Sequence, residues 1–178
     1  MRGTAYLRSS LAYLLAGSHA LLADPAAADA DPKAEAVPAY LNPQAIVADA
    51  ETSTAYVALS GTHEVAKVDL EKNVLAERFP VGQTPTGLAL DRSGRRLAVT
   101  VGEAVGQVVL LQSSTGHVET TWEAGFSPNA PAFVNGGRAL AVCNRFTDEV
   151  TFFEVPSGER LSSVASGREP IAAVPDAS

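Results

Sequence analysis

The sequence predicts an all-β fold built from a repeated four-stranded unit. Prolines at 43, 85, 128 and 170 recur every 42 or 43 residues, and a glycine stands three positions before each of the last three. Turn-forming residues recur every eight to twelve positions, and helical spacing of apolar residues is absent after residue 35. A period near forty with four short strands is typical of a β-propeller blade.

The opening strand of each unit begins at its proline. Two positions later the residue is always small: Ala45, Gly87, Ala130 and Ala172. The innermost strands of a propeller crowd around a central tunnel, which favours such small side chains. Asp49 or Asp91 then ends the strand and is expected to accept backbone hydrogen bonds in a turn.

The other three strands of each unit follow from the same alignment. Apolar runs at 56–59, 98–101 and 141–144 predict the second strands. The third strands are predicted at 65–70, 108–112 and 150–155. Left-handed hairpin turns are predicted at Asn73, Gly116 and Gly158, and the fourth strands lead from there to Phe79, Trp122 and Val164.

These alignments predict blades at about 43–84, 85–127 and 128–169, with 170–178 as the first strand of a fourth. Three blades leave the ring incomplete, since propellers typically have about four to eight. We therefore expect the chain to be the N-terminal part of a longer protein. The alternative is a small protein that assembles blades between subunits.

The repeat also resembles a known family. The tetrad Ala141-Val142-Cys143-Asn144, the Gly-x-x-Pro boundaries and the turn 91–94 followed by 97–101 are similar to the bacterial YVTN β-propeller repeat. That family is a surface or periplasmic relative of WD40-type propellers, and the resemblance covers about residues 40–178. The tyrosine of the family tetrad survives only at Tyr56 and its asparagine only at Asn144.

A narrower likeness concerns the third unit. The run 128–131 leading to 143–146 resembles propellers that precede a c-type cytochrome or di-haem peroxidase-like domain. Cys143 is the only cysteine, so this sequence has no Cys-x-x-Cys-His haem attachment and no cofactor is expected in the chain itself. The resemblance implies that a haem partner domain would lie outside this chain.

The N-terminus predicts export. Arg2 and Arg8 precede an apolar stretch at 11–22 and then small residues, which is the pattern of a secretory signal peptide over 1–30, with a linker at 31–39. The stretch is too short to span a membrane. The expected location is periplasmic or extracellular, with no membrane span after signal removal. An Ala-rich helix and a disordered tail are the alternatives.

Composition excludes some functions. The chain carries 13 Lys and Arg against 20 Asp and Glu, with a net charge of −7, which argues against nucleic-acid binding. His63 and His117 fall on different blades and in different positions, so they do not predict a metal site. Cys143, within an apolar strand, is expected to be a buried small hydrophobe.

The loops on one rim hold the candidate binding residues. The crossover at each proline and the loop between the second and third strands emerge on the same rim, where function concentrates. Arg145 beside Phe146 is the preferred site, because such pairs anchor interfaces. A solvated arginine with a phenylalanine folded back into the blade is the alternative. The full set of candidates is Arg145, Phe146, Asn144, Asp148, His63 and Glu64.

Two functions remain open at this point. The first is a non-catalytic exported propeller that binds a partner protein or a cell-surface component. The second is an enzyme with its site at the tunnel mouth, as in lactonase-like propellers or propeller subunits of periplasmic dehydrogenases. Mostly small and apolar residues on the inner strands favour the binding function.

Overall fold

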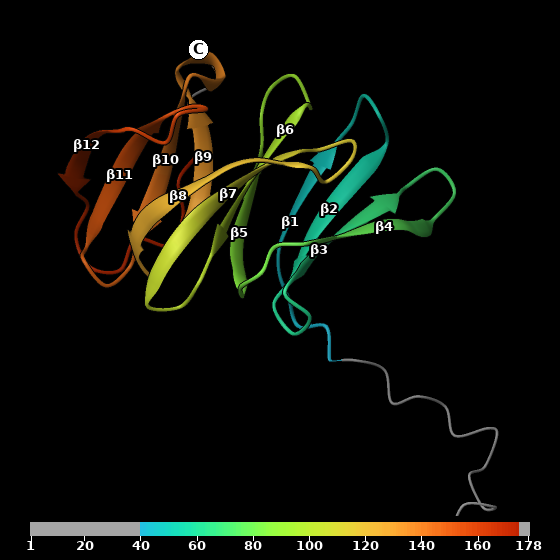
Figure 1. Ribbon diagram of the computed structural model, residues 1–178, viewed down its shortest axis with the longest axis horizontal. Coiled ribbons are helices and arrows are strands. Elements are labelled where there is room, and N and C mark those ends of the chain that lie inside the picture. Colours follow the sequence, from blue (N-terminus) through green and yellow to red (C-terminus); the bar gives the residue numbers. More distant parts are fainter. Residues whose placement is uncertain (1–39, 175–178) are drawn as a thin grey trace, which may run out of the picture. The chain divides into compact units, whose positions relative to one another are not determined.

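Residues 40–174 form three four-stranded antiparallel sheets in this computed structural model, which describes these residues alone (Figure 1). Sheet 1 contains β1 (Pro43–Asp49), β2 (Thr54–Leu59), β3 (Glu64–Asp69) and β4 (Val74–Pro80). Sheet 2 contains β5 (Pro85–Leu90), β6 (Arg96–Val101), β7 (Val105–Gln112) and β8 (Val118–Phe126). Sheet 3 contains β9 (Pro128–Val134), β10 (Ala139–Asn144), β11 (Glu149–Glu154) and β12 (Arg160–Ala165).

Strand order within every sheet follows the chain, and within residues 40–174 no sheet takes strands from two units. The predicted all-β fold of consecutive four-stranded units in an incomplete ring is therefore confirmed. A three-residue 3-10 turn, η2 (Asn135–Gly137), joins β9 to β10. Residues 170–174, predicted to open a fourth unit, form no strand, and 175–178 lie outside the described residues, as do the predicted signal peptide and linker.

Local turn chemistry explains where the strands end. Asn73, Gly116 and Gly158 all have positive φ, at 56°, 70° and 75°, which confirms the predicted hairpin turns between third and fourth strands. Asp49 Oδ1 accepts a hydrogen bond from the Glu51 amide at 3.0 Å. In the second unit, Asp91 Oδ1 accepts from two backbone amides of the following turn. Both aspartates therefore hold turns, as predicted.

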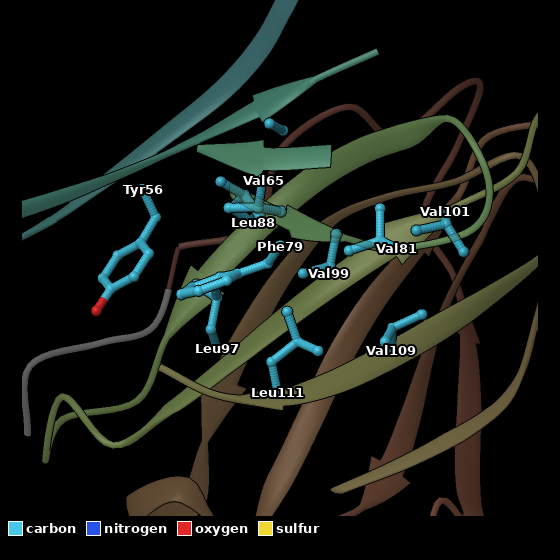
Figure 2. Close-up of a cluster of buried hydrophobic side chains, with 11 residues drawn as sticks. Tyr56, Val65, Phe79, Val81, Leu88, Leu97, Val99, Val101, Val109 and Leu111 are labelled. Carbon is cyan, nitrogen blue, oxygen red and sulfur yellow. The ribbon is translucent and has the colours of Figure 1, made fainter. Parts of the chain in front are cut away.

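Sheet 2, green to yellow in Figure 1, lies between the other two sheets. Its two faces are both apolar, one packed in each of two hydrophobic clusters. Alternate residues of β6 and β7 point to opposite faces, so Leu97 packs toward sheet 1 and Leu110 toward sheet 3. We call the contact between sheets 1 and 2 seam 1, shown in Figure 2, and that between sheets 2 and 3 seam 2. Phe79 in seam 1 and Trp122 in seam 2 occupy equivalent positions.

The inner strands approach one another closely at the predicted small residues. A Cβ atom added to Gly87 on β5 would stand 2.7 Å from Pro131 Cδ and 2.8 Å from the Ala130 nitrogen on β9. Beside it, the Thr86 hydroxyl donates a 2.6 Å hydrogen bond to the Pro128 carbonyl of β9. The crowding that the sequence pattern predicted is therefore present between sheets 2 and 3.

A leucine-to-alanine substitution should destabilise the protein more inside seam 1 than on the exposed surface of the neighbouring sheet. Leu97→Ala removes a fully buried side chain from seam 1 and is expected to lower the free energy of unfolding by about 2–5 kcal/mol. Leu75→Ala on β4, where the side chain is 49% exposed, should cost less than about 1 kcal/mol. Urea denaturation of both variants measures the difference, and equal losses would contradict the role assigned to seam 1.

Candidate binding rim and inner groove

The β10–β11 turn carries Arg145 at one rim of sheet 3. Its guanidinium Nη2 lies 3.4 Å from Glu169 Oε2 in the segment that follows β12. Its backbone amide donates to the Ser127 carbonyl at 3.3 Å, in the crossover that enters sheet 3. Its Nε is buried and has no hydrogen-bond partner in the described part of the chain. The Arg145 head group is thus held at the rim with one donor unused.

Phe146 projects from the same turn. Its side chain is 67% exposed, so it does not fold back into the sheet. An exposed aromatic ring beside a guanidinium is the composition of an interface anchor. The alternative expectation, a phenylalanine packed within the blade, does not describe this structure.

Asp148 fixes the turn that presents these two side chains. Its Oδ1 accepts a hydrogen bond from the Glu169 amide at 2.8 Å, and its carbonyl accepts one from the Ser166 amide at 3.0 Å. Its own φ is +55°. The carboxylate therefore joins the turn to the following crossover. We define the candidate rim as Arg145, Phe146, Asp148 and Glu169.

Asn144 requires a correction. It was a candidate for the rim surface, but its side chain is fully buried at the end of β10. Its Nδ2 donates to Thr151 Oγ1 at 2.9 Å, and a Cβ atom added to Gly125 would stand 2.6 Å from its Oδ1. The residue is part of seam 2, at the repeat position that Val101 occupies in seam 1. It therefore supports the turn from inside and does not belong to the binding surface.

His63 and Glu64 occupy the equivalent turn of sheet 1. His63 has a positive φ of 57°, and its carbonyl accepts the Val81 amide at 3.0 Å, just as Asp148 accepts Ser166. Across the described residues, no hydrogen bond or ion pair joins these two residues to the candidate rim. The six candidates therefore do not form one site. Arg145, Phe146 and Asp148 lie in one turn, His63 and Glu64 lie in another, and Asn144 is buried.

Glu64 forms an ion pair of its own. Its Oε2 accepts a 2.8 Å hydrogen bond from Arg78 Nη1 on β4, and this contact lowers the pKa of the carboxyl below its ordinary value. A group whose pKa is lower in the folded state stabilises that state at higher pH. This contribution is lost as pH falls through the lowered pKa.

The structure also contains a groove that sequence reasoning missed. It encloses about 980 Å³ along the inner strands of all three sheets. Apolar residues such as Leu88 and Phe133 line it, and Arg92 and Arg138 contribute charge at the turns. Neither arginine was predicted as a site residue, because their convergence depends on how β5 and β9 lie side by side.

A second, polar groove of about 690 Å³ lies between the turns of sheets 1 and 2. Asp49, Asp91 and Arg96 are among its lining residues. Both aspartates already accept hydrogen bonds within their turns, and the Asp49–Thr52 hydrogen bond lowers the pKa of Asp49. Within residues 40–174, no three His, Cys, Asp or Glu side chains come together in a group that could hold a metal ion.

Two further observations concern the described chain. Cys143 is fully buried in β10, and this burial raises the pKa of its thiol. Between residues 40 and 174, the structure has no helix of the length and hydrophobicity that crossing a membrane requires.

The Arg78 contact with Glu64 predicts a selective change in acidity. In Arg78→Gln, we expect the pKa of Glu64 to rise toward its ordinary value, because the charged donor is gone. Asp69, whose pKa is held low by Lys72, is the internal control and should not change. Carboxyl ¹³C titration by NMR measures both. The assignment fails if Glu64 stays low or if the two residues shift together.

Comparisons with known proteins identify the fold. No family model and no curated protein sequence matches the chain. Among solved structures, Kuenenia stuttgartiensis hydrazine synthase aligns with a TM-score of 0.67 at 17% identity, covering 73% of this chain and 38% of that one. U3-55K and the RRP9 WD40 repeats each align with a TM-score of 0.64 at 13% identity, covering 72% of this chain and 41% and 40% of theirs. The chain therefore spans less than half the length of these structures, and its three sheets have the WD40-like β-propeller fold.

Proposed function

We propose that this protein is an exported, non-catalytic propeller that binds a partner protein through the candidate rim. The proposal rests on one observation. Phe146, which is 67% exposed, stands next to Arg145 in a turn that the Asp148 carboxylate holds in place. Aromatic and arginine side chains dominate binding energy at protein interfaces. A fixed turn also loses little conformational entropy when it binds.

The rim defines what the partner should present. Phe146 fits an apolar pocket, and the Arg145 guanidinium, on a side chain that is 38% exposed, fits a hydrogen-bond acceptor. Glu169, the present partner of Arg145, has a side chain that is 62% exposed, so an incoming carboxylate can compete for the guanidinium. We infer that the bound segment carries an apolar side chain next to an acidic one.

Two finer parts of the proposal rest on the sequence. The YVTN-type repeat and the signal peptide pattern over 1–30 support a surface or periplasmic location. The likeness of the third unit to propellers that precede c-type haem domains supports such a domain as a candidate partner outside this chain.

The enzyme alternative would use the inner groove. Within the described residues, its charged lining comes from Arg92 and Arg138, which suit an acidic group of a ligand. The rim is favoured over the groove because it combines an exposed aromatic ring with a partly exposed guanidinium.

The rim proposal is tested with a crosslinking probe. A photoreactive phenylalanine analogue placed at position 146 should crosslink one defined protein in periplasmic extract, which mass spectrometry identifies. With that protein purified, Arg145→Ala should weaken binding by about 30-fold or more, as expected for an interface anchor.

Matched controls come from the opposite end of the strands. Arg138→Ala, in the turn before β10, and the photoreactive analogue at Val118, 44% exposed at the start of β8, should leave binding and crosslinking unaffected. Equal crosslinking from positions 146 and 118, or unchanged affinity of Arg145→Ala, would remove the candidate rim as the site.

Export is tested by the mass of the recovered protein. When the full sequence is expressed in a bacterium, the periplasmic product should lack the residues up to Ala20, Ala28 or Ala30, each of which has a small residue two positions earlier. Leu14→Asp interrupts the apolar stretch and should leave the full-length protein in the cytoplasm. Recovery of uncleaved wild-type protein from the cytoplasm alone would refute the export proposal.

A further inference from the structure

The inner groove has the size and composition of a small-molecule site. Its volume of about 980 Å³ lies within the range of about 300–1,000 Å³ that is usual for ligand pockets. Its walls come from the inner strands, among which β5 lies between β1 and β9 (Figure 1). Val47, Leu90 and Val134, one from each of these strands, are half-buried and present apolar surface to the groove. A ligand there contacts three sheets at once.

The charged side chains that line the groove are all positive. Arg92, in the β5–β6 turn, and Arg138, in the turn before β10, belong to the lining, whereas no Asp or Glu of residues 40–174 does. Both arginines are exposed, and neither forms an ion pair within the described chain. The Arg138 side chain donates two long hydrogen bonds, each of 3.3 Å, to Asn135 oxygens. Both guanidinium groups are therefore available to an anion.

This local positive charge is opposite in sign to the charge of the whole chain. The net charge of −7 repels anions from the protein surface in general. Four other arginines each form an ion pair with a glutamate: Arg78, Arg96, Arg145 and Arg160. An anion that binds in the groove is therefore held by the groove itself, because overall electrostatic attraction does not bring it there.

We propose that the inner groove binds a small amphipathic anion, whose charged group is held by Arg92 and Arg138. The apolar part of the ligand lies along the half-buried side chains of the three inner strands, where it loses contact with water. Carboxylate and phosphate oxygens both match the planar donor fork of arginine. The chemistry that the groove recognises is thus an anionic head group on an apolar body.

The groove is distinct from the candidate rim. β9 begins at Pro128, next to the Ser127 carbonyl that accepts the Arg145 amide, and ends at Val134 in the groove. The seven residues of this extended strand separate its two ends by about 20 Å. The inner strands of a propeller surround a central channel, which stays open when the ring is complete. Further sheets would therefore add wall to the groove without filling it.

Isothermal titration calorimetry of the full chain at neutral pH tests the proposal with three probes: decanoate, decyl phosphate and 1-naphthoate. At least one probe should bind, and comparison of the first two shows which head group is preferred. Decanol has the decanoate chain without the charge, so it should bind at least about 10-fold more weakly than the preferred decyl anion. Arg92→Gln and Arg138→Gln should each weaken binding of that anion by about 10-fold, because each removes a charge-assisted donor.

A matched control comes from the same turn as Arg92. Arg95 is also exposed and also forms no ion pair within residues 40–174, but it lines the polar groove between sheets 1 and 2. Arg95→Gln should therefore leave anion binding unchanged, as should Arg145→Ala at the candidate rim. Circular dichroism checks that each variant is folded.

Methyl chemical shifts locate the bound anion. On binding, the methyl groups of Val47, Leu90 and Val134 should shift, whereas those of Leu75, exposed on β4, should not. The proposal is overturned if none of the three probes binds, if decanol binds as tightly as the decyl anions, or if Arg95→Gln weakens binding as much as Arg92→Gln. Shifts at Leu75 without shifts in the groove would also overturn it.

Discussion

The apolar contact between adjacent sheets is the interaction on which the rest of this structure depends. Among the described residues, the fully buried leucine side chains belong to sheets 2 and 3 and are Leu97, Leu110, Leu111 and Leu140. Full burial of each such side chain is worth about 1.5–3 kcal/mol. Hydrogen bonds within a sheet fix its strands, whereas the apolar seams, with a few hydrogen bonds between sheets, fix one sheet against the next. Stability in such repeats is a sum of unit and neighbour terms, so sheet 2, with two seams, is the most strongly held.

Much of this architecture could be predicted from spacing alone. The proline that opens β1, β5 and β9 and the left-handed residue at Asn73, Gly116 and Gly158 are local signals, because backbone conformation at these positions selects the residue type. The small residue at Gly87 is a signal of longer range, because it is required by the close approach of β9, more than forty residues later in the chain. Repetition made that signal visible, because the same position is small in every unit.

The candidate site was less predictable for a physical reason. Asn144 is polar and precedes a turn, which indicated the surface, yet it shares a face with Val142 two residues earlier, and that face is buried. Strand alternation therefore outweighs residue polarity at that position. The inner groove was missed because it depends on the distance and twist between inner strands, for which a single sequence carries no local signal. The sequence likewise left open whether Phe146 is exposed or folded back into the blade, because this depends on the conformation of its turn.

The hydrogen bond from Thr86 to the Pro128 carbonyl has a consequence for how the sheets can move. It ties sheets 2 and 3 together at their inner edges, where Gly87 also brings the backbones into contact. The outer strand β12 is exposed along its whole length and has no comparable tie among the described residues. We therefore expect the separation between sheets 2 and 3 to vary least at this inner edge.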